Sequence, residues 1–435
     1  MTDGARLGAA GAGGAVAVPA RPPGLRVVLD ARPLQEPDRA PLTAAYLGGL
    51  LAAYDADPLP GESFALLLRS DLDDPTTQFA NLDVIGRRLL PPTHLLRSAA
   101  LTVDPFLLSG ASLGAAWKAE AGGAAGAVYH ALGGAVPLAT RVPVVVTLLD
   151  LAPWELPRAY QRTVPGRLGQ GLRGRLLRDA AAVIVGSEAV ATAARRVLRI
   201  RRDRLRVVAL APRPAFSFWA AGSADSAVAS RAERGRLGLP ERYLVYSGRY
   251  DARQDLATLL RALSLLAAAG RPDGLPDDVP WPPRVLLVGA SPEDRASLAR
   301  AAARVDVGDA LAYAPRLSDE RVAALVRGAR AAILPALSDA TGLPALEAVA
   351  CGTPVVASAV GALPDAVGAA GILVPPREPE RLAAALATTW ADDRVHARLV
   401  AAAREEAEAG VRTWADVGAD TRRIYAEVGI GASGR

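Results

Sequence analysis

The sequence predicts an α/β protein made of two doubly wound domains, each with a parallel sheet covered by helices on both faces. Three observations predict this class. Short β-branched runs alternate with Ala/Leu/Arg stretches of helical period from Leu25 onward. The same alternation restarts after residue 240. The length of 435 residues also exceeds what one hydrophobic core usually serves.

The first series of elements lies in the N-terminal half of the chain. We expect helices between its strands, for example at 43–56 and 188–200. Its strand candidates are the apolar runs at 25–30, 64–69, 127–131, 142–150, 181–187 and 205–212.

The second series follows a polar segment and has the same character. Residues 270–283, rich in Pro, Gly and Asp, are predicted to form a surface loop between a helix and the next strand. A long helical region at 378–409 precedes a last helix at 414–428. The strand candidates of this series are 242–248, 284–290, 311–316, 331–336, 354–358 and 371–376.

These series set the domain boundaries. Two facing sheets of this kind place the carboxyl ends of their strands around a shared cleft, where such folds bind ligands. We expect a disordered tail at 1–24, with a signal peptide as the alternative. A first domain at 25–217 and a second domain at 241–410 are joined by a linker at 218–240. The last segment, 411–435, is a helix with a short tail that returns to the first domain.

The composition excludes several kinds of site and segment. A single cysteine, Cys351, excludes an internal disulfide and a Cys-based zinc site, and the three histidines lie far apart, so we expect no metal site. No apolar run reaches 18 residues, so we expect no membrane span. The net charge is +5, and Lys118 is the only lysine among 50 basic residues, so nearly all positive charges are arginines. This charge favours either an anionic partner or simply solvated arginines.

The stretch "AAILPALSDATGLPALEAVACG" (331–352) predicts a strand, a tight loop and a helix that begins near Leu343. Pro344 lies in the first turn, where its missing N–H is harmless, and Gly342 allows close backbone approach. The turn from Thr341 to Pro344 is predicted to be a phosphate site, because the free N–H groups of Thr341, Gly342 and Leu343 lie at the helix start and the helix dipole aids them. Glu347, about one turn further, is placed to reach ligand hydroxyls such as those of a ribose.

This stretch, with "GALPDAVGAAGILVPP" after it, resembles the Glu-x7-Glu region of retaining GT-B glycosyltransferases, family 4 (group 1). The resemblance extends over residues 25–428. Its other motifs are "VVVTLLDLAPWELPRAY", "AAVIVGSEAVATAA", "LVYSGRYDARQDLATLLRAL" and "WADVGADTRRIY". It implies the GT-B fold, two Rossmann-like domains with a shared cleft and a C-terminal crossover helix.

The resemblance also implies a function. Family members move a sugar from a nucleotide-diphosphate donor to a glycan, lipid-linked or small-molecule acceptor, retain the anomeric configuration and need no metal or cofactor. Arg249, after Gly248, stands at the family's diphosphate arginine, for which a solvated loop arginine is the alternative reading. The family's second phosphate cation, a lysine, is Gln254 here, and the neighbouring Arg253 is the residue that would compensate.

The resemblance assigns two carboxylates and one histidine. Glu347 matches the acid at the donor ribose, and Asp339, shorter than the family's Glu, matches the acid at the donor sugar. The alternatives are a solvated helix acid for Glu347 and a turn-capping acid for Asp339. Leu149 replaces a family histidine, while His130 matches another near the cleft, or is a packed strand-end histidine.

Two hypotheses follow. The first is an active transferase in which Asp339, His130 and Arg249 take part in catalysis. The second is a catalytically weakened or inactive GT-B protein that acts as a binding or scaffold partner of another glycosyltransferase. Its support is the coincidence of Leu149, Gln254, Asp339 and a segment without glycine at 31–47. A nicotinamide or P-loop enzyme is excluded, because G-x-G-x-x-G after the first strand and G-K-[ST] are both missing.

Basic residues also suggest where the protein works. The run "RRVLRIRRDRLR" (195–206) predicts either contact with an anionic membrane that carries a lipid-linked acceptor, or simply Arg-rich helix surfaces. We expect a cytoplasmic protein, peripheral at the inner membrane face, that binds a nucleotide sugar and no nucleic acid. The arginines upstream that join this expectation are Arg162, Arg167, Arg173, Arg175 and Arg178.

Overall fold

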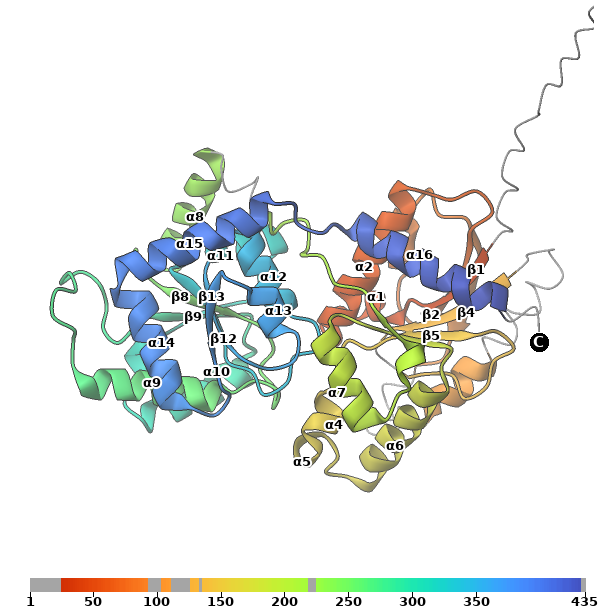
Figure 1. Ribbon diagram of the computed structural model, residues 1–435, viewed down its shortest axis with the longest axis horizontal. Coiled ribbons are helices and arrows are strands. Elements are labelled where there is room, and N and C mark those ends of the chain that lie inside the picture. The colour runs from red at the N-terminus through yellow and green to blue at the C-terminus, as the bar shows by residue number, and fades with distance from the viewer. Residues whose placement is uncertain (1–24, 93–102, 111–125, 133–134, 218–223, 432–435) are drawn as a thin grey trace, which may run out of the picture.

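The computed structural model describes residues 25–92, 103–110, 126–132, 135–217 and 224–431. The predicted tail at 1–24 lies outside these residues. The chain forms two lobes side by side, each a sheet enclosed by helices, and it returns to the first lobe just before its last helix, which lies against that lobe (Figure 1). The predicted class and the crossover are therefore confirmed.

The first domain contains a parallel sheet of seven strands in the order β3-β2-β1-β4-β5-β6-β7. The chain starts in the middle of the sheet and winds outward in both directions, so the order reverses between β1 and β4. The strands are β1 Leu25–Asp30, β2 Ser63–Arg69, β3 Val84–Leu90, β4 Gly126–Leu132, β5 Val144–Thr147, β6 Ala182–Val185 and β7 Leu205–Val207.

Strand β3 was not predicted from the sequence. It is the edge strand, hydrogen-bonded on one side only to β2, and most of its side chains are exposed. Gly86 and two arginines interrupt its apolar pattern, and Leu89 is 61% exposed. Because an edge strand needs little burial, the hydrophobic alternation that reveals the inner strands is missing here.

The second domain contains a parallel sheet of six strands in the order β10-β9-β8-β11-β12-β13, which reverses between β8 and β11. All six predicted strands are present, shortened at their ends. They are β8 Leu244–Ser247, β9 Val285–Val288, β10 Leu311–Ala314, β11 Ala331–Leu334, β12 Val355–Ser358 and β13 Gly371–Val374.

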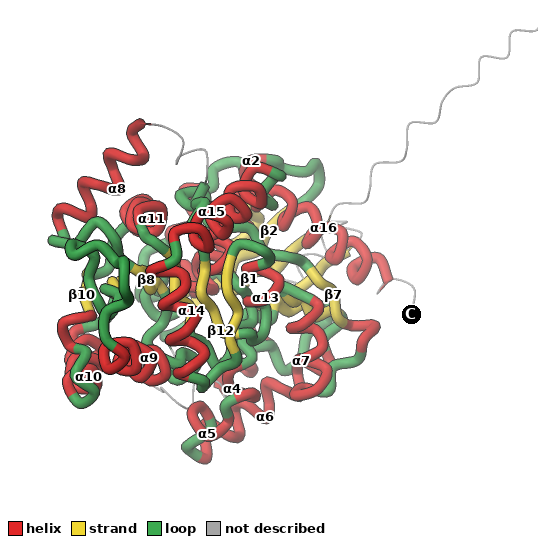
Figure 2. Tube along the Cα trace, turned by 60° about the vertical axis from the view of Figure 1, so that its left-hand side comes forward, coloured by secondary structure: helices red, strands yellow, loops and turns green. Residues whose placement is uncertain are grey.

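Helices cover both faces of each sheet (Figure 2). In the first domain they are α1 Arg32–Gln35, α2 Pro41–Ala56, α4 Ala152–Glu155, α5 Pro157–Tyr160, α6 Val164–Asp179 and α7 Glu188–Leu198. In the second they are α8 Ala224–Arg236, α9 Leu256–Ala269, α10 Pro292–Ala303, α11 Asp319–Gly328, α12 Leu343–Ala350, α13 Leu363–Val367, α14 Pro379–Ala391 and α15 Asp393–Glu408, followed by α16 Trp414–Gly431. Short 3-10 turns lie at η1 Pro75–Gln78, η3 Arg202–Arg204 and η4 Gly308–Ala310.

The expected linker at 218–240 is not structure-poor throughout, because residues 224–236 form α8. This helix packs on α11 through polar contacts. The Ser230 hydroxyl donates to the carbonyl of Ala324 at 2.8 Å, and Glu233 accepts from Arg321 at 2.9 Å. Since these contacts come from tertiary packing, the polar composition of the segment gave no sign of them.

Each sheet separates two apolar cores, as expected when helices lie on both faces. In β1, Val27 and Leu29 face one core and Val28 faces the other. In β8, Val245 faces one core, whereas Leu244 and Tyr246 face the opposite one. This burial explains why these short strands read as continuous apolar runs in the sequence.

Helix α16 completes the first domain. The Trp414 ring meets Tyr46 of α2 edge to face with centroids 5.7 Å apart, and Tyr425 is fully buried in the same core. Gly49 makes this possible, since a Cβ there would lie 2.3 Å from the Trp414 ring. Among the described residues, no helix has the length and apolar character needed to cross a bilayer.

Candidate functional site

A cleft of about 690 Å³ lies between the two domains. It opens at the carboxyl ends of the strands, where the strand order of each sheet reverses, which is where doubly wound sheets bind ligands. Of the predicted site residues, the cleft gathers Gly248, Arg249, Arg253, Gln254, Asp339, Thr341, Leu343, Pro344 and Glu347. The first domain contributes, among others, Leu34, Asp38, Leu149 and Asp150.

The loop between β11 and α12 has the predicted tight turn. Gly342 adopts a left-handed conformation with φ of 64°, and helix α12 begins at the next residue with Pro344 in its first turn. A Cβ on Gly342 would lie 2.7 Å from that of Ala366. Gly361 is under a tighter constraint, because a Cβ there would lie 1.6 Å from the carbonyl oxygen of Asp339. Both glycines are therefore needed for this close approach.

Asp339 caps the turn that follows it. Its Oδ1 accepts hydrogen bonds from the backbone N–H of Gly342 at 2.7 Å and of Thr341 at 2.9 Å. Burial raises the pKa of the Asp339 carboxyl, and these N–H donors oppose the rise. The turn-capping role considered from the sequence is thus present. Two of the N–H groups predicted to receive a phosphate are donated to this carboxylate instead.

Glu347 is buried in the first turns of α12 and forms a two-pronged ion pair with Arg213. The Arg213 Nε lies 2.6 Å from Oε1 and its Nη2 lies 2.9 Å from Oε2. A third nitrogen of Arg213 binds Asp319 at the start of α11. Burial raises the pKa of Glu347, while Arg213 lowers it. The reading of Glu347 as a solvated helix residue is wrong, since only 5% of the residue is exposed.

Arg249 and Arg253 share one carboxylate. The Arg249 Nε donates to Asp251 Oδ2 at 2.9 Å, and the Arg253 Nε donates to Asp251 Oδ1 at 3.0 Å. The backbone N–H of Arg253 also donates to Oδ1 at 3.1 Å. Asp251 therefore sits between the two cations that were predicted to hold a diphosphate.

Arg253 also reaches the other domain. Its Nη2 lies 3.1 Å from Asp150 Oδ2, and its guanidinium lies over the ring of Tyr160, 5.7 Å from the centroid. The Tyr160 hydroxyl donates to Asp251 at 3.1 Å. Burial alone would lower the pKa of Arg253, but the attraction of Asp150 and Asp251 raises it above its usual value. Gln254, beside it, lines the cleft and forms an isolated backbone bridge with Ala336.

His130 does not reach the cleft, so we leave it out of the proposed site. It is fully buried in β4, with Nδ1 2.6 Å from the Tyr425 hydroxyl and Nε2 2.8 Å from that of Thr147. Burial lowers the pKa of His130 to about 3. The satisfied strand-end histidine considered from the sequence is what the structure contains. Leu149, by contrast, does line the cleft, as an apolar surface.

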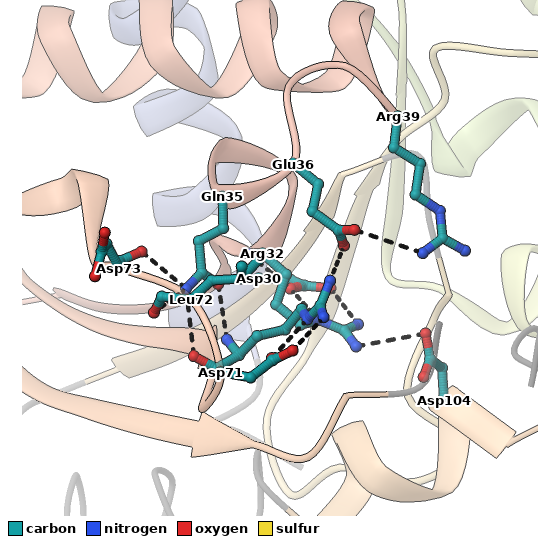
Figure 3. Close-up of polar contacts among 10 residues, drawn as sticks. Asp30, Arg32, Gln35, Glu36, Arg39, Asp71, Leu72, Asp73 and Asp104 are labelled. Carbon is teal, nitrogen blue, oxygen red and sulfur yellow. Dashed lines mark hydrogen bonds and ion pairs between the residues drawn. The ribbon is translucent and has the colours of Figure 1, made fainter. Parts of the chain in front are cut away.

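The glycine-free segment at 31–47 is fastened by polar contacts (Figure 3). Arg32 binds Asp30 with Nη2 to Oδ2 at 2.7 Å, and its Nη1 lies 3.4 Å from Asp104. Gln35 donates to three backbone carbonyls, and Arg69 pairs with both Glu36 and Asp71. The segment forms the short helix α1 and then one wall of the cleft. These contacts fix its path, whereas the family resemblance leads one to expect a flexible loop that contains glycine.

Four functional candidates were missed from the sequence, namely Asp150, Tyr160, Arg213 and Asp251. Arg213 follows the last strand of the first domain, where no motif marked it. Asp251 lies within "GRYDARQD", and its spacing of two residues from each arginine was a usable signal. Arg173 needs a correction, because it was grouped with the membrane-facing arginines but is buried, 4.9 Å from the centroid of the Trp154 ring.

No metal site stands out in the part of the chain that the structure describes, where no three His, Cys, Asp or Glu side chains are grouped closely enough to hold an ion. The charged groups of the cleft are instead arginines paired with carboxylates. Such guanidinium groups suit an anionic ligand with several oxygens.

Comparison with known families identifies the C-terminal region. Residues 230–406 match the model of the family described as glycosyl transferases group 1. This segment contains the whole of the second sheet and the residues from Gly248 to Glu347 that were predicted to bind a nucleotide sugar. The resemblance seen in the sequence is therefore confirmed for this region.

Curated relatives agree with this match. The chain is 39% identical over 166 residues to a D-inositol 3-phosphate glycosyltransferase of Streptomyces griseus, covering 36% of this chain and 33% of that protein. It is 39% identical over 126 residues to an MMP alpha-(1->4)-mannosyltransferase of Mycolicibacterium hassiacum, covering 28% and 30%. The chain thus spans about a third of the length of each of these relatives.

Solved structures match nearly the whole chain at low identity. Sucrose-phosphate synthase from Thermosynechococcus elongatus superposes with a TM-score of 0.64 at 20% identity, covering 93% of this chain and 98% of that one. Anabaena HepE, solved in complex with UDP-glucose, superposes with a TM-score of 0.63 at 16% identity, covering 93% and 99%. These neighbours establish the GT-B fold.

Proposed function

We propose that this chain, which carries a group 1 glycosyl transferase region on a GT-B fold, transfers a sugar from a nucleotide-diphosphate sugar with retention of configuration and without a metal. One observation carries the proposal. Arg249 and Arg253 stand at the carboxyl end of β8, facing the same cleft as the glycine turn that opens α12. The UDP-glucose complex of HepE, a structural neighbour, supports a nucleotide sugar as the ligand.

The diphosphate would lie between these two elements. Guanidinium groups bind phosphate oxygens in pairs, and donors already fixed in place stabilise the charge that develops on the leaving group. Arg249 offers its terminal nitrogens, since its Nε is held by Asp251. The N–H groups of Thr341 and Gly342 are donated to Asp339, so their contribution to the phosphate would be weaker than that of the arginines.

The ribose and the sugar would contact the two acids. A carboxylate has about four acceptor positions, and Arg213 takes one on each oxygen of Glu347, so others remain for ribose hydroxyls. Asp339 uses Oδ1 for the turn, which leaves Oδ2 for a hydroxyl of the donor sugar. In this arrangement Arg213 holds Glu347 in position.

We assign the acceptor proton to the leaving phosphate, following the family resemblance. Leu149 lines the cleft on the first-domain side and can accept no proton. His130 is buried away from the cleft, with both ring nitrogens engaged. The acceptor itself is proposed only as a class: a glycan, a lipid-linked glycan or a small molecule.

An exposed face of α6 supports a membrane-bound acceptor. Val164 and Leu168 are 58% and 64% exposed, and Arg162, Arg167 and Arg175 are exposed beside them. Such a face suits an anionic bilayer surface. Arg206 of the basic run at 195–206 is paired with Glu427, which weakens the contribution of that run. Sedimentation with vesicles that contain anionic lipid, compared with neutral vesicles, tests the contact, and equal binding to both would contradict it.

One observation favours the second hypothesis, a weakened or inactive binding partner. Three arginines that line the cleft, Arg213, Arg253 and Arg316, are each paired with a carboxylate that also lines it. A nucleotide must therefore compete with internal anions. This competition lowers affinity and does not by itself exclude turnover.

Calorimetric titration with common nucleotide sugars, followed by an assay for donor hydrolysis and transfer, separates the hypotheses. We expect binding to at least one donor and a retained anomeric configuration in the product. Absence of binding to every common donor would overturn the transferase, and binding without turnover would favour the scaffold.

A further inference from the structure

Asp251 lies outside the cleft but contacts Arg249 and Arg253, two of the arginines that line it. It accepts from the Nε of Arg249 through one oxygen and from the Nε of Arg253 through the other, at 2.9 and 3.0 Å. Asp251 itself does not line the cleft, whereas both arginines do. The carboxylate thus lies behind the two guanidinium groups and not in the space where a ligand would bind.

The consequence for Arg249 is orientation. A guanidinium bound through its Nε leaves the edge formed by its two terminal nitrogens available for a bidentate contact. In Arg253 the terminal Nη2 already points to Asp150 across the cleft, at 3.1 Å. A long arginine side chain otherwise loses much rotamer freedom on binding, and a preset orientation reduces that loss.

Further contacts fix Asp251. The backbone N–H of Arg253 donates to its Oδ1, and so does the hydroxyl of Tyr160 from the first domain, each at 3.1 Å. Burial raises the pKa of Asp251, but the guanidinium groups of Arg253 and Arg249 and the backbone N–H of Arg253 outweigh it and lower that pKa. The carboxylate therefore remains charged and can hold both cations at once.

We propose that Asp251 is a positioning residue that presents Arg249 and Arg253 to a diphosphate ligand. The inference rests on the proposed function, because it assumes that the cleft receives a diphosphate. It goes further in assigning a role to an acid that contacts no ligand and that stands two residues from each arginine.

The test uses the variant Asp251→Asn in the full chain. Asn keeps the size of the side chain but can accept through only one atom, so it cannot hold both Nε groups. We expect binding of inorganic pyrophosphate and of UDP to weaken about tenfold, as when a charge-assisted contact is loosened. Uridine, which has no phosphate, should bind the variant and the parent protein equally. A general loss of structure would weaken uridine as well.

Three further variants complete the test. Asp203→Asn is the matched control, because Asp203 pairs with Arg201 at the same two-residue spacing outside the cleft, and it should leave pyrophosphate binding unchanged. In a background of Arg249→Ala and Arg253→Ala, adding Asp251→Asn should cause no further loss. An additional loss there would show that Asp251 acts otherwise than through the arginines, and would overturn the proposal.

The outcomes separate this inference from the proposed function. Pyrophosphate binding that is unchanged or tighter in Asp251→Asn overturns the inference and leaves the transferase intact. Pyrophosphate and UDP binding that weakens as expected, without transfer from any donor, supports the inference and overturns the transferase. A parent protein that binds neither pyrophosphate nor any common nucleoside diphosphate overturns both.

Discussion

Arg213 and Glu347, 134 positions apart in the chain, form a two-pronged ion pair in which Nε lies 2.6 Å from Oε1 and Nη2 lies 2.9 Å from Oε2. Arg213 lies at the end of the first domain, shortly before the second begins, and Glu347 lies in α12 of the second domain. The pair therefore joins the connection between the domains to the helix whose start faces the cleft.

Removal of this arginine should destabilise the protein. Arg213→Ala leaves Glu347, only 5% exposed, without its cation. Loss of one partner of a fully buried pair costs about 3–5 kcal/mol, and because the Arg213 side chain is 26% exposed we expect about 2 kcal/mol. Urea unfolding measures the change. The double variant Arg213→Ala with Glu347→Gln should recover part of the loss, and no recovery would contradict the buried-charge explanation.

Asp339 should behave chiefly as a cap in stability measurements. Asp339→Ala removes the acceptor for two N–H groups and should cost about 1 kcal/mol of unfolding free energy, while Asp339→Asn, which keeps an acceptor oxygen, should cost less. Thermal unfolding of the ligand-free proteins measures this difference. Equal losses for Ala and Asn would argue that the charge matters more than the hydrogen bonds.

Gln254 offers a gain-of-function test. Gln254→Lys restores a cation to the cleft wall at the position where the family resemblance expects one. An added charge-assisted contact should tighten nucleoside diphosphate binding about fivefold to tenfold, with a steeper salt dependence. Titration at two ionic strengths checks both effects. Ala257, exposed on α9, is a control site for an added lysine, and an equal gain there would point to net charge alone.

His130 should make stability depend on pH. The folded protein keeps the ring neutral because burial lowers its pKa to about 3, whereas in the unfolded chain it titrates near 6.5. The unfolded state therefore binds more protons between these values, so stability is full above about pH 6.5 and falls as the pH drops toward 3. We expect His130→Gln to lose less unfolding free energy between pH 7 and pH 4.5 than the parent protein. An unchanged pH dependence would contradict this assignment.

The fold was predictable because inner strands of a doubly wound sheet are buried on both faces. The run 25–30 became β1 without adjustment, and the helix near Leu343 began where the glycine and proline placed it. Strand β3 and helix α8 escaped prediction for the opposite reason. Their polar composition carries no burial pattern, and partners elsewhere in the chain stabilise them.

The candidate site was predictable only in part. The motifs correctly predicted that Arg249, Asp339 and Glu347 lie at one cleft, because all three follow strand ends of the second sheet. Motifs did not reveal which internal partners these side chains bind. Arg213 comes from the connection between domains, and Asp150 comes from the first sheet, so only the packing of the two domains brings them to the site.

The position of α16 has a consequence for how the protein is made. Trp414, Val417 and Tyr425 belong to the apolar core of the first domain, and Tyr425 is hydrogen-bonded to His130 of β4. A ribosome synthesises β4 nearly three hundred residues before Tyr425. Part of the apolar core of the first domain therefore stays uncovered until the second domain has been translated. We expect residues 25–217 produced alone to aggregate, and co-produced α16 peptide to relieve this.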